Sequence, residues 1–367
     1  MEASGDALLA LLLPHLRALR PDLRWAGMGG PLSAAAGLEV MVDPRPLAAH
    51  GLTEALGALP ATWRALRRLR ALSEGARALL LVDAPEVNTR LLRHAAPRGL
   101  PVAYLAPPQA WAWRPGRAAL LREARWLGCL FEFEAAWYCA RGARAVEVGH
   151  PLLLAPPPAL DPEGGHLLLC PGSRPSSARR ALPLAIRALA ALNARRAARG
   201  EEALRGVLAL SEWLERSPSA QEARALAERL GVPLEVRAGL RAGLNGARLA
   251  LCHAGTATLE LGLAGLPFVA MAPLSPLSAA VARRLVRAPR YALPNLILGE
   301  EVCEELPPRP LDPLNAALAL ERLLCPSSWE ETRARLEGLS RRVLRPDPAR
   351  RARELLSALG FPPLADP

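Results

Sequence analysis

Short continuous apolar runs alternate along the chain with longer stretches in which apolar residues recur at helical spacing. A parallel strand that is covered on both faces reads as an unbroken apolar run, because neither face meets water. Runs of this kind predict strands at residues 78–82, 101–105, 145–148, 166–170, 206–210, 233–236, 248–252 and 267–271.

Helical stretches lie between these runs, and alternating strands and helices predict parallel sheets with helices on both faces. The pattern predicts helices near 6–19 and 61–76, and three more near 314–324, 329–344 and 349–359. A length of 367 residues suits two domains, and the Pro-rich segment 154–163 reads as the linker between them.

We therefore predict an α/β fold with two Rossmann-like, doubly wound domains, at residues 1–155 and 164–343, followed by a terminal segment at 344–367. In open sheets of this type, ligands bind outside the carboxyl ends of the strands. The loops that follow the strands are therefore expected to carry the function, on a cleft that the two domains share.

The chain carries 46 basic against 35 acidic side chains, a formal net charge of +11, and every basic residue is Arg. Because Lys is absent, the sequence excludes a Walker-A phosphate loop, a Schiff-base enzyme and a Lys general base. The positive charge favours a polyanionic partner, such as nucleic acid, an anionic bilayer or a phosphorylated substrate.

The sequence predicts a cytoplasmic protein with no metal site. Its first residues show no basic region leading into an apolar one, and no apolar run approaches the roughly 18 residues that span a bilayer. The 6 Cys residues are widely spaced, which predicts reduced thiols. His150 and His253 lie beside predicted cleft loops, but neither has a partner at metal-ligand spacing, so we interpret both as structural.

Asp83 directly follows the apolar run 78–82 and so stands at the carboxyl end of a predicted strand. A carboxylate in this position can take a proton from a sugar hydroxyl. The position also suits an N-cap of the next helix, so both interpretations stay open.

Two further loops join a predicted strand to a helix: Pro171-Gly172-Ser173-Arg174 and Gly255-Thr256-Ala257-Thr258-Leu259-Glu260. Backbone N–H groups at a helix start, the Ser173 hydroxyl and the Arg174 guanidinium can converge on a phosphate. Gly255 lets a ligand approach the backbone, and Glu260 can accept hydrogen bonds from ribose hydroxyls. The competing interpretations are an ordinary turn with a solvated Arg, and a Thr256 cap with a solvated Glu.

The segment 107–117 concentrates 2 of the 8 Trp residues beside two Arg residues, namely Trp111, Trp113, Arg114 and Arg117. Apolar rings beside cations suit an amphiphilic substrate or a bilayer interface, and they also suit stacking on nucleic acid. A buried aromatic loop plug is the alternative interpretation.

In their order along the chain, these motifs resemble those of the lipid-A-disaccharide synthases. Several motifs in the same order are more specific evidence for a family than any single motif, and these motifs are spread over nearly the whole chain. The matching strings are Glu2-Ala3-Ser4-Gly5-Asp6, Val82-Asp83-Ala84-Pro85-Glu86-Val87-Asn88, Trp111-Ala112-Trp113-Arg114, Gly149-His150-Pro151, Pro171-Gly172-Ser173-Arg174, Gly255-Thr256-Ala257-Thr258-Leu259-Glu260 and Leu293-Pro294-Asn295-Leu296.

The resemblance implies a GT-B glycosyltransferase fold in which the last helices return to the N-terminal domain. It implies inverting transfer, without a metal or cofactor, of 2,3-diacylglucosamine from its UDP donor to 2,3-diacylglucosamine 1-phosphate, which forms a β(1→6) linkage and releases UDP. The partners it implies are these two substrates and the anionic cytoplasmic face of the inner membrane, and not nucleic acid. The resemblance leaves the oligomeric state open.

Carried over residue by residue, the resemblance makes Asp83 the general base on the acceptor hydroxyl and Arg174 the holder of the departing diphosphate. Inversion needs one carboxylate base and a stabilised leaving group, and donors fixed at a helix start can replace a metal. The implied nucleotide side also contains Ser173, Gly255, Thr256, Glu260 and Asn295, and the acceptor side of the cleft contains Glu2, Ser4, Trp111 and Arg114.

The chain departs from the family pattern at three places. Ser177 stands where an acidic residue is usual, and Ala272-Pro273 stands where an aromatic-basic pair is usual. A strand ending in Gly is expected before Glu2 but is absent from the sequence. We expect the first two departures to affect affinity and acyl preference, and a chain extended upstream to be more stable and more active.

Two alternatives remain open at this point. One is another UDP-N-acetylglucosamine glycosyltransferase or epimerase of the same architecture, although the Gly-rich tract and the His/Arg/Glu constellation of those enzymes are not seen. The other is a non-catalytic basic module that binds membrane or RNA, which the charge favours. That module would leave Asp83 and the two phosphate-type loops without a role.

Overall fold

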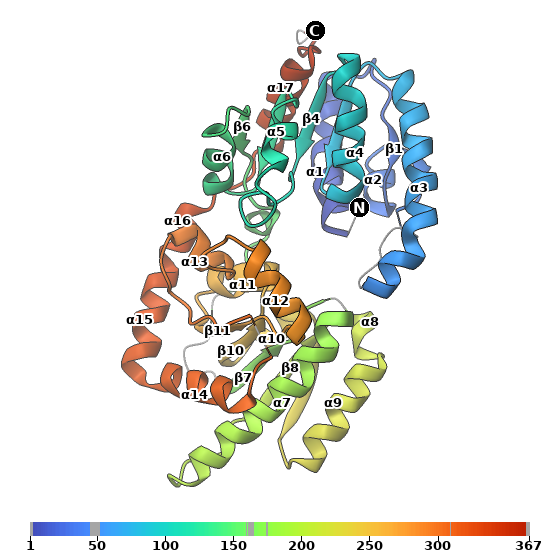
Figure 1. Cartoon of the computed structure of the whole chain (residues 1–367). Helices are drawn as coiled ribbons and strands as arrows, with labels where there is room; N and C mark the ends of the chain where they lie inside the picture. The colour runs from blue at the N-terminus through green and yellow to red at the C-terminus, as the bar shows by residue number, and fades with distance from the viewer. Residues whose placement is uncertain are drawn as a thin grey trace. The chain divides into compact units, whose positions relative to one another are not determined.

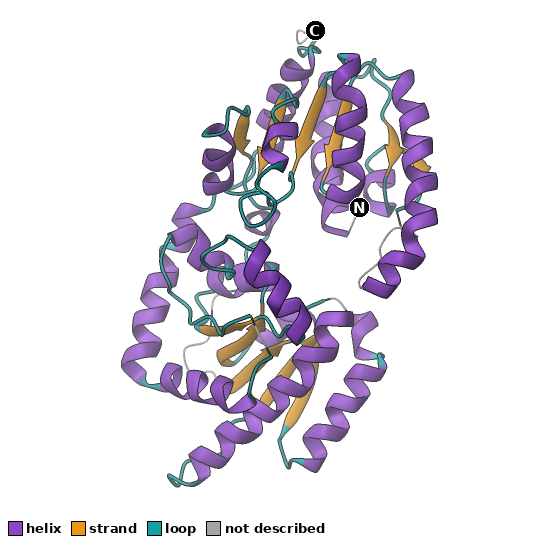
Figure 2. Cartoon of the chain, viewed as in Figure 1, coloured by secondary structure: helices purple, strands orange, loops and turns teal. Residues whose placement is uncertain are grey.

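The computed structural model describes residues 3–44, 52–158, 160, 165–173, 175–308 and 310–364. The chain divides into two compact units, Met1–Leu154 with Val343–Pro367, and Ala155–Arg342. Each unit contains parallel strands with helices packed around them (Figures 1 and 2). The predicted α/β fold class is therefore confirmed.

The larger sheet of the first unit has four parallel strands in the order β3-β4-β5-β6. Their bounds are Leu79–Val82, Val102–Leu105, Trp126–Cys129 and Ala145–Glu147. All residues of β4 and β5 are buried, as expected for strands covered on both faces. The sequence pattern missed β5, which is short and contains Gly128; a Cβ there would lie 2.4 Å from the Trp126 ring.

Two further strands of this unit, β1 (Ala26–Met28) and β2 (Glu39–Val42), form a separate parallel pair. The sequence pattern missed them because β1 has only 3 residues and β2 is mostly exposed or half-buried. A cavity of about 530 Å³ lies between β1 and β3, and mainly apolar residues line it. Within the residues that the structure describes, β1 therefore pairs with β2 and not with β3.

Helices cover both faces of the four-stranded sheet. On one face, α1 (Ala3–Leu19) and α17 (Pro348–Leu359) share a core with Val82 and Leu105, so the two ends of the chain pack together. On the other face, α4 (Pro85–Ala95) and α6 (Glu132–Cys139) pack against Tyr104 and Leu127. The remaining helices of this unit are α2 (Pro31–Ala35), α3 (Leu52–Glu74), η2 (Ala96–Arg98), α5 (Arg117–Leu121) and η3 (Pro151–Leu154).

The second unit has one parallel five-stranded sheet in the order β11-β10-β7-β8-β9. The bounds are β7 (His166–Cys170), β8 (Gly206–Leu210), β9 (Leu234–Ala238), β10 (Ala247–His253) and β11 (Phe268–Met271). The predictions for β7 and β8 are correct at both ends. The chain moves from β7 to β8 on one side and later returns to place β10 on the other side. The loops after β7 and β10 therefore meet at a topological switch point, where doubly wound sheets bind ligands.

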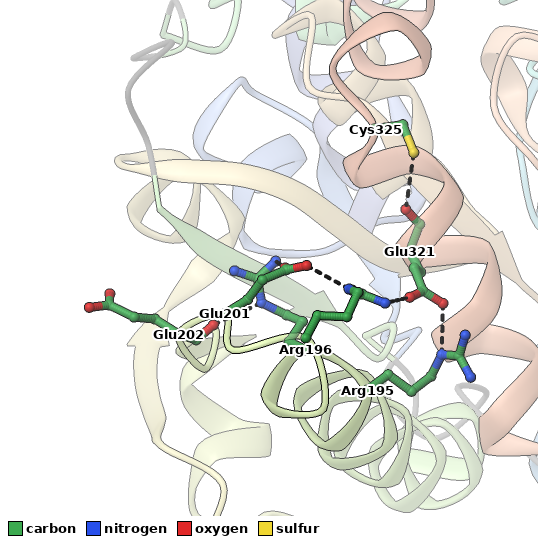
Figure 3. Close-up of polar contacts among 7 residues, drawn as sticks. Arg195, Arg196, Glu201, Glu202, Glu321 and Cys325 are labelled. Carbon is green, nitrogen blue, oxygen red and sulfur yellow. Dashed lines mark hydrogen bonds and ion pairs between the residues drawn. The ribbon is translucent and has the colours of Figure 1, made fainter.

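The helices of the second unit surround this sheet. The longest, α7 (Pro175–Ala197), shares a core with α14 (Pro313–Leu324), and Arg195 at its end donates to Glu321 over 2.7 Å (Figure 3). The others are α8 (Glu212–Glu215), α9 (Pro218–Arg229), α10 (Gly239–Leu244), α11 (Thr256–Leu263), α12 (Pro276–Leu285), α13 (Leu293–Leu298), α15 (Pro326–Glu337) and α16 (Leu339–Arg342).

The helix predicted at 329–344 is wrong in its extent. The structure breaks this stretch into α15 and α16 at Gly338, the C-cap of α15. Glycine weakens a helix interior because it gains the most backbone freedom on leaving it.

Candidate active site

Asp83 lies at a strained bend between β3 and α4. Its φ is 49° and that of Ala84 is 43°, both in the left-handed region that residues with a Cβ rarely enter. The Asp83 carbonyl accepts hydrogen bonds from the Tyr104 hydroxyl (2.8 Å) and from Asn88 Nδ2 (2.7 Å). Ala84, not Asp83, occupies the N-cap position of α4, so the N-cap interpretation of Asp83 is wrong.

The same strain recurs in the segment that follows β4. Among the described residues, the non-glycine positions with positive φ are Asp83, Ala84, Ala106 (51°) and Arg114 (57°). All of them follow β3 or β4, which are neighbouring parallel strands, so they belong to loops that leave the same edge of the sheet. Strain of this kind persists only where the surroundings enforce it, and it gathers at functional sites.

The loop after β4 is held at its base and exposed at its tip. Pro108 and Ala110 are buried, and the Tyr138 hydroxyl donates to the Pro108 carbonyl. Trp111 is half-buried, with its Nε1 3.0 Å from Glu134 Oε1. Arg114 is exposed, and its guanidinium lies 4.4 Å from the centre of the Trp113 ring. The buried-plug interpretation therefore fits the first half of the loop but not the second.

The first motif of the chain is only partly described. Glu2 lies outside the described residues, and Ser4 is exposed in the first turn of α1. Sequence reasoning gave no role to Asp6, whose buried carboxylate accepts hydrogen bonds from the backbone N–H groups of Gly30, Leu32 and Ser33 and from the Ser33 hydroxyl. Burial works against ionisation, but these donors outweigh it and lower the pKa of Asp6. Asp6 therefore ties the start of α1 to the start of α2.

In the second unit, the loops after β7 and β10 touch each other. Gly172 has a φ of 89°, and a Cβ there would lie 3.3 Å from the His253 ring. Ser173 and Gly255 are exposed; α7 begins two residues after Ser173, and α11 begins directly after Gly255. The start of a helix carries positive partial charge, which suits a phosphate. Arg174 lies outside the described residues.

Thr256 and Glu260 lie in the first two turns of α11, the helix that begins after Gly255. Gly255 is the N-cap of α11 and no side chain caps this helix, so the Thr256-cap interpretation is wrong; Thr256 itself is exposed. The Glu260 side chain is only 15% exposed, with Oε1 3.3 Å from Arg241 Nε, so the solvated-Glu interpretation is also wrong. Burial raises the pKa of Glu260, and Arg241 opposes that shift. Sequence reasoning missed Arg241 because it follows β9 in no recognisable motif.

The Asn295 side chain is buried. Its Oδ1 accepts from Val302 N and Cys303 N, both at 2.9 Å, and its Nδ2 donates to Cys303 O and to Glu305 Oε1. These four bonds use the whole capacity of an amide side chain. Glu305 in turn accepts from the backbone of Tyr291 and Ala292. Asn295 therefore ties α13, which contacts α11, to the segment 302–305 that follows it.

The remaining sequence expectations concern metals, histidines and the bilayer. Within the described residues, no cluster of three or more His, Cys, Asp or Glu side chains could bind a metal ion. His150 is buried against the Phe131 ring, and burial lowers its pKa to about 4, so it is neutral. No helix in the described part of the chain is long and apolar enough to cross a membrane.

Solved structures with the same fold identify the class. The S. aureus MnaA–UDP co-structure gives a TM-score of 0.53 at 11% identity, over 89% of this chain and 88% of that one. A putative UDP-N-acetylglucosamine 2-epimerase from Listeria monocytogenes gives 0.52 at 12% identity, over 97% and 93%. The fold is therefore that of the GT-B class, with two Rossmann-like units.

The sequence comparisons identify the family within this class. The family model described as lipid-A-disaccharide synthetase matches residues 1–337. The lipid-A-disaccharide synthase of Anaeromyxobacter dehalogenans (strain 2CP-C) is 38% identical over 340 residues, which are 88% of this chain and 86% of that protein. The corresponding enzyme of Myxococcus xanthus (strain DK1622) is 34% identical over 358 residues, which are 92% and 90%.

The chain belongs to the lipid-A-disaccharide synthetase family, and it is a glycosyltransferase of lipid A disaccharide synthesis. The resemblance that the sequence motifs indicated is confirmed. Two alternatives were left open by the sequence, and both are wrong: another UDP-N-acetylglucosamine glycosyltransferase or epimerase, and a non-catalytic basic module.

Proposed function

We propose that the protein transfers 2,3-diacylglucosamine from its UDP donor to 2,3-diacylglucosamine 1-phosphate, with a β(1→6) linkage and release of UDP. The observation that carries this proposal is the bend at Asp83, which Tyr104 and Asn88 hold at a cost in backbone strain. Because these hydrogen bonds hold the bend, they fix the backbone position from which the Asp83 carboxylate projects. A general base requires a fixed position more than a capping residue does.

In this proposal, Asp83 takes the proton of the acceptor's 6-hydroxyl as its oxygen attacks the anomeric carbon of the donor. The bond from that carbon to the diphosphate breaks, and the electron pair leaves with UDP. A single displacement inverts the anomeric carbon, so one carboxylate is sufficient. Trp111 and Arg114, on the loop after the neighbouring strand β4, contact the acceptor in the same scheme.

The loops of the second unit bind the donor nucleotide in this proposal. The diphosphate lies at the starts of α7 and α11, against Ser173, Gly255 and Thr256, with the Arg174 guanidinium on its oxygens. Negative charge builds on the diphosphate as the bond breaks, so these donors bind the transition state more strongly than the substrate. Glu260 accepts hydrogen bonds from the ribose hydroxyls, and Arg241 favours its ionised form. Asn295 acts indirectly, by tying α13 to the segment 302–305.

Both proposed substrates carry acyl chains, so we also propose peripheral binding at the cytoplasmic face of the inner membrane. Helix α3 offers a surface suited to this role. Trp63 is 62% exposed, and the Arg67 guanidinium lies 5.2 Å from the centre of its ring. Arg64 and Arg68 are exposed beside them. An exposed aromatic ring among cations matches the headgroup layer of an anionic bilayer.

The deciding experiment is a mass-spectrometric assay of the purified protein with both acylated substrates, set beside UDP-N-acetylglucosamine as donor. We expect disaccharide and UDP from the acylated donor only. Asp83→Asn should keep the fold and UDP binding but lower turnover by about 10²–10⁴, the usual share of a positioned base.

Asp22→Asn is the matched control, because Asp22 pairs with Arg20 in the same unit and takes no part in the proposed chemistry. Absence of product with either donor would overturn the proposed reaction. If Asp83→Asn keeps turnover within a few-fold of wild type, Asp83 is not the base.

A further inference from the structure

Glu134 is a buried carboxylate that none of the proposed steps uses. It lies on α6 and is 7% exposed. Its Oε1 accepts from Trp111 Nε1 (3.0 Å), and its Oε2 accepts from Leu130 N (3.2 Å). Both partners can only donate, so the ionised carboxylate matches them at both oxygens.

The loop after β4 is pinned to α6 at two points. One is the hydrogen bond from Trp111 to Glu134, and the other is that from the Tyr138 hydroxyl to the Pro108 carbonyl. Phe133 adds a T-shaped contact to the Trp111 ring, with the ring centres 5.0 Å apart. Beyond these pins the chain runs directly into Trp113 and the left-handed Arg114. The position of Trp111 therefore sets where the exposed tip of the loop lies.

Protonation of Glu134 falls within the physiological range of pH. Burial raises its pKa to about 7, and repulsion from Glu147 on β6 adds to that shift. Three neighbouring titratable groups stay neutral there: burial raises the pKa of Cys129 on β5 and of Tyr138 on α6 far above neutrality, and lowers that of His150 to about 4. Burial also raises the pKa of Glu147, the charged neighbour, so the pH response of Glu134 is coupled to that carboxylate.

We infer that Glu134 is a positioning residue for the loop after β4. Its ionised carboxylate holds this loop in place through the hydrogen bond with Trp111. This inference rests on the proposed function, in which Trp111 and Arg114 lie on the acceptor side. A protonated Glu134 carries an O–H group on one oxygen, and that O–H faces an N–H donor. One of the two hydrogen bonds is then lost and the other loses its charge assistance, so the hold on Trp111 weakens whichever oxygen carries the proton.

Loop anchoring and protein stability should respond to pH with opposite signs. The pKa of Glu134 is raised from an ordinary value of 4.5 to about 7, so the folded state prefers the protonated form. Its contribution to the free energy of unfolding is complete below the ordinary value and is lost as pH rises through about 7. Ionisation of Glu134 therefore anchors the loop but lowers the free energy of unfolding. The opposite pH dependence of these two effects distinguishes a positioning role from a purely structural one.

The test compares pH profiles of kcat/KM for the acceptor in wild type and Glu134→Gln. The wild-type profile should rise through pH 7, and the variant should lose that rise because its amide does not titrate. At pH 8 the KM for the acceptor should increase by about tenfold, the effect of losing a hydrogen bond to a charged group. UDP binding by calorimetry should be unchanged, and Glu134→Asp should recover part of the pH dependence.

Trp111→Phe removes the Nε1 donor together with part of the indole ring, and it should likewise lose the rise through pH 7. The double variant Glu134→Gln/Trp111→Phe should be no worse than Trp111→Phe alone, because both substitutions break the same hydrogen bond. Trp137→Phe is the matched control, since Trp137 lies on the same helix and packs edge-on against Tyr138, whereas the Glu134 carboxylate bonds to Trp111 and Leu130. If Glu134→Gln fails to fold, Trp111→Phe carries the test alone.

An unchanged pH profile in Glu134→Gln, or additive losses in the double variant, would overturn the inference. The proposed function fails separately. It is overturned if the wild-type protein makes no disaccharide at any pH. Activity in the wild type but not in Asp83→Asn would support the proposed function. An unchanged pH profile in Glu134→Gln would then exclude only the positioning role of Glu134.

Discussion

The Tyr104 hydroxyl donates a hydrogen bond to the main-chain carbonyl of Asp83, 2.8 Å away in the bend that follows the neighbouring strand β3. Tyr104 is fully buried, and burial together with the nearby Asp83 charge raises its pKa well above the ordinary value. The phenol therefore stays protonated, and a hydrogen-bond donor, at neutral pH and well above it. Tyr104, on the buried strand β4, thus stabilises the backbone position of the proposed base Asp83.

Tyr104→Phe should lower turnover several-fold and the free energy of unfolding by about 1 kcal/mol, the usual net contribution of one hydrogen bond. The loss is limited because Asn88 Nδ2 still donates to the same carbonyl. Urea denaturation and the disaccharide assay measure the two effects. Tyr291→Phe is the control: its hydroxyl donates to Ala270 O in the second unit, so stability should fall with little change in turnover. Equal turnover losses in both variants would argue against a specific support of Asp83.

Arg241→Ala should weaken UDP binding and make it dependent on pH. Removal of the guanidinium leaves the Glu260 carboxylate without the cation that opposes the rise in its pKa. Glu260 then protonates more readily, so UDP affinity should fall as the pH is lowered from neutral. The coupling between Arg241→Ala and Glu260→Gln should be only about 0.5–1 kcal/mol, because Arg241 is half exposed and water screens the pair.

Calorimetry of UDP binding at neutral and at mildly acid pH checks this prediction. Arg237→Ala serves as control, since Arg237 pairs with Glu235 on β9 and not with a proposed ligand-binding residue. The prediction fails if Arg241→Ala binds UDP as wild type does at both pH values.

The apolar pattern predicted the long buried strands well but missed those whose identity depends on their neighbours. β7 and β8 read as unbroken apolar runs because both faces of that sheet are covered. β1 and β2 are short and exposed, and they exist through pairing with each other, which no local pattern records. Sequence reasoning likewise placed Gly338 inside one helix, although it separates two.

The candidate site shows the same division. Asp83, Ser173 and Gly255 follow strands in the sequence, and the structure places them at strand ends. The partners that hold the site come from distant positions: Tyr104 for Asp83, Arg241 for Glu260 and Glu134 for Trp111. Only tertiary packing brings these pairs together, so spacing along the chain carried no signal of them.

Trp63→Ala, on α3, should reduce binding to anionic vesicles more than to neutral ones. The ring and the neighbouring Arg side chains act together, because the apolar ring enters the interface while the cations meet lipid phosphates. Co-sedimentation with vesicles at low and at raised salt measures the effect. Trp137→Ala, on α6 of the same unit, is a control that leaves the α3 surface intact. Equal partitioning of wild type to neutral and anionic vesicles at low salt would contradict the proposal.

Gly27→Ala should stabilise the first unit, because Gly27 lines the cavity of about 530 Å³ between β1 and β3. A Cβ added at this position would have no atom within 4 Å, and the backbone there is not in the left-handed region. The substitution therefore adds no strain, and alanine loses less backbone entropy than glycine when the strand forms. We expect a gain of about 0.5–1 kcal/mol in the free energy of unfolding. Gly128→Ala is the opposite case, since its Cβ would lie 2.4 Å from the Trp126 ring in a packed strand, and it should destabilise the same unit. Urea denaturation of both variants decides the matter: a loss of stability in Gly27→Ala would mean that β1 and β3 approach each other in solution and leave no space for the added methyl group.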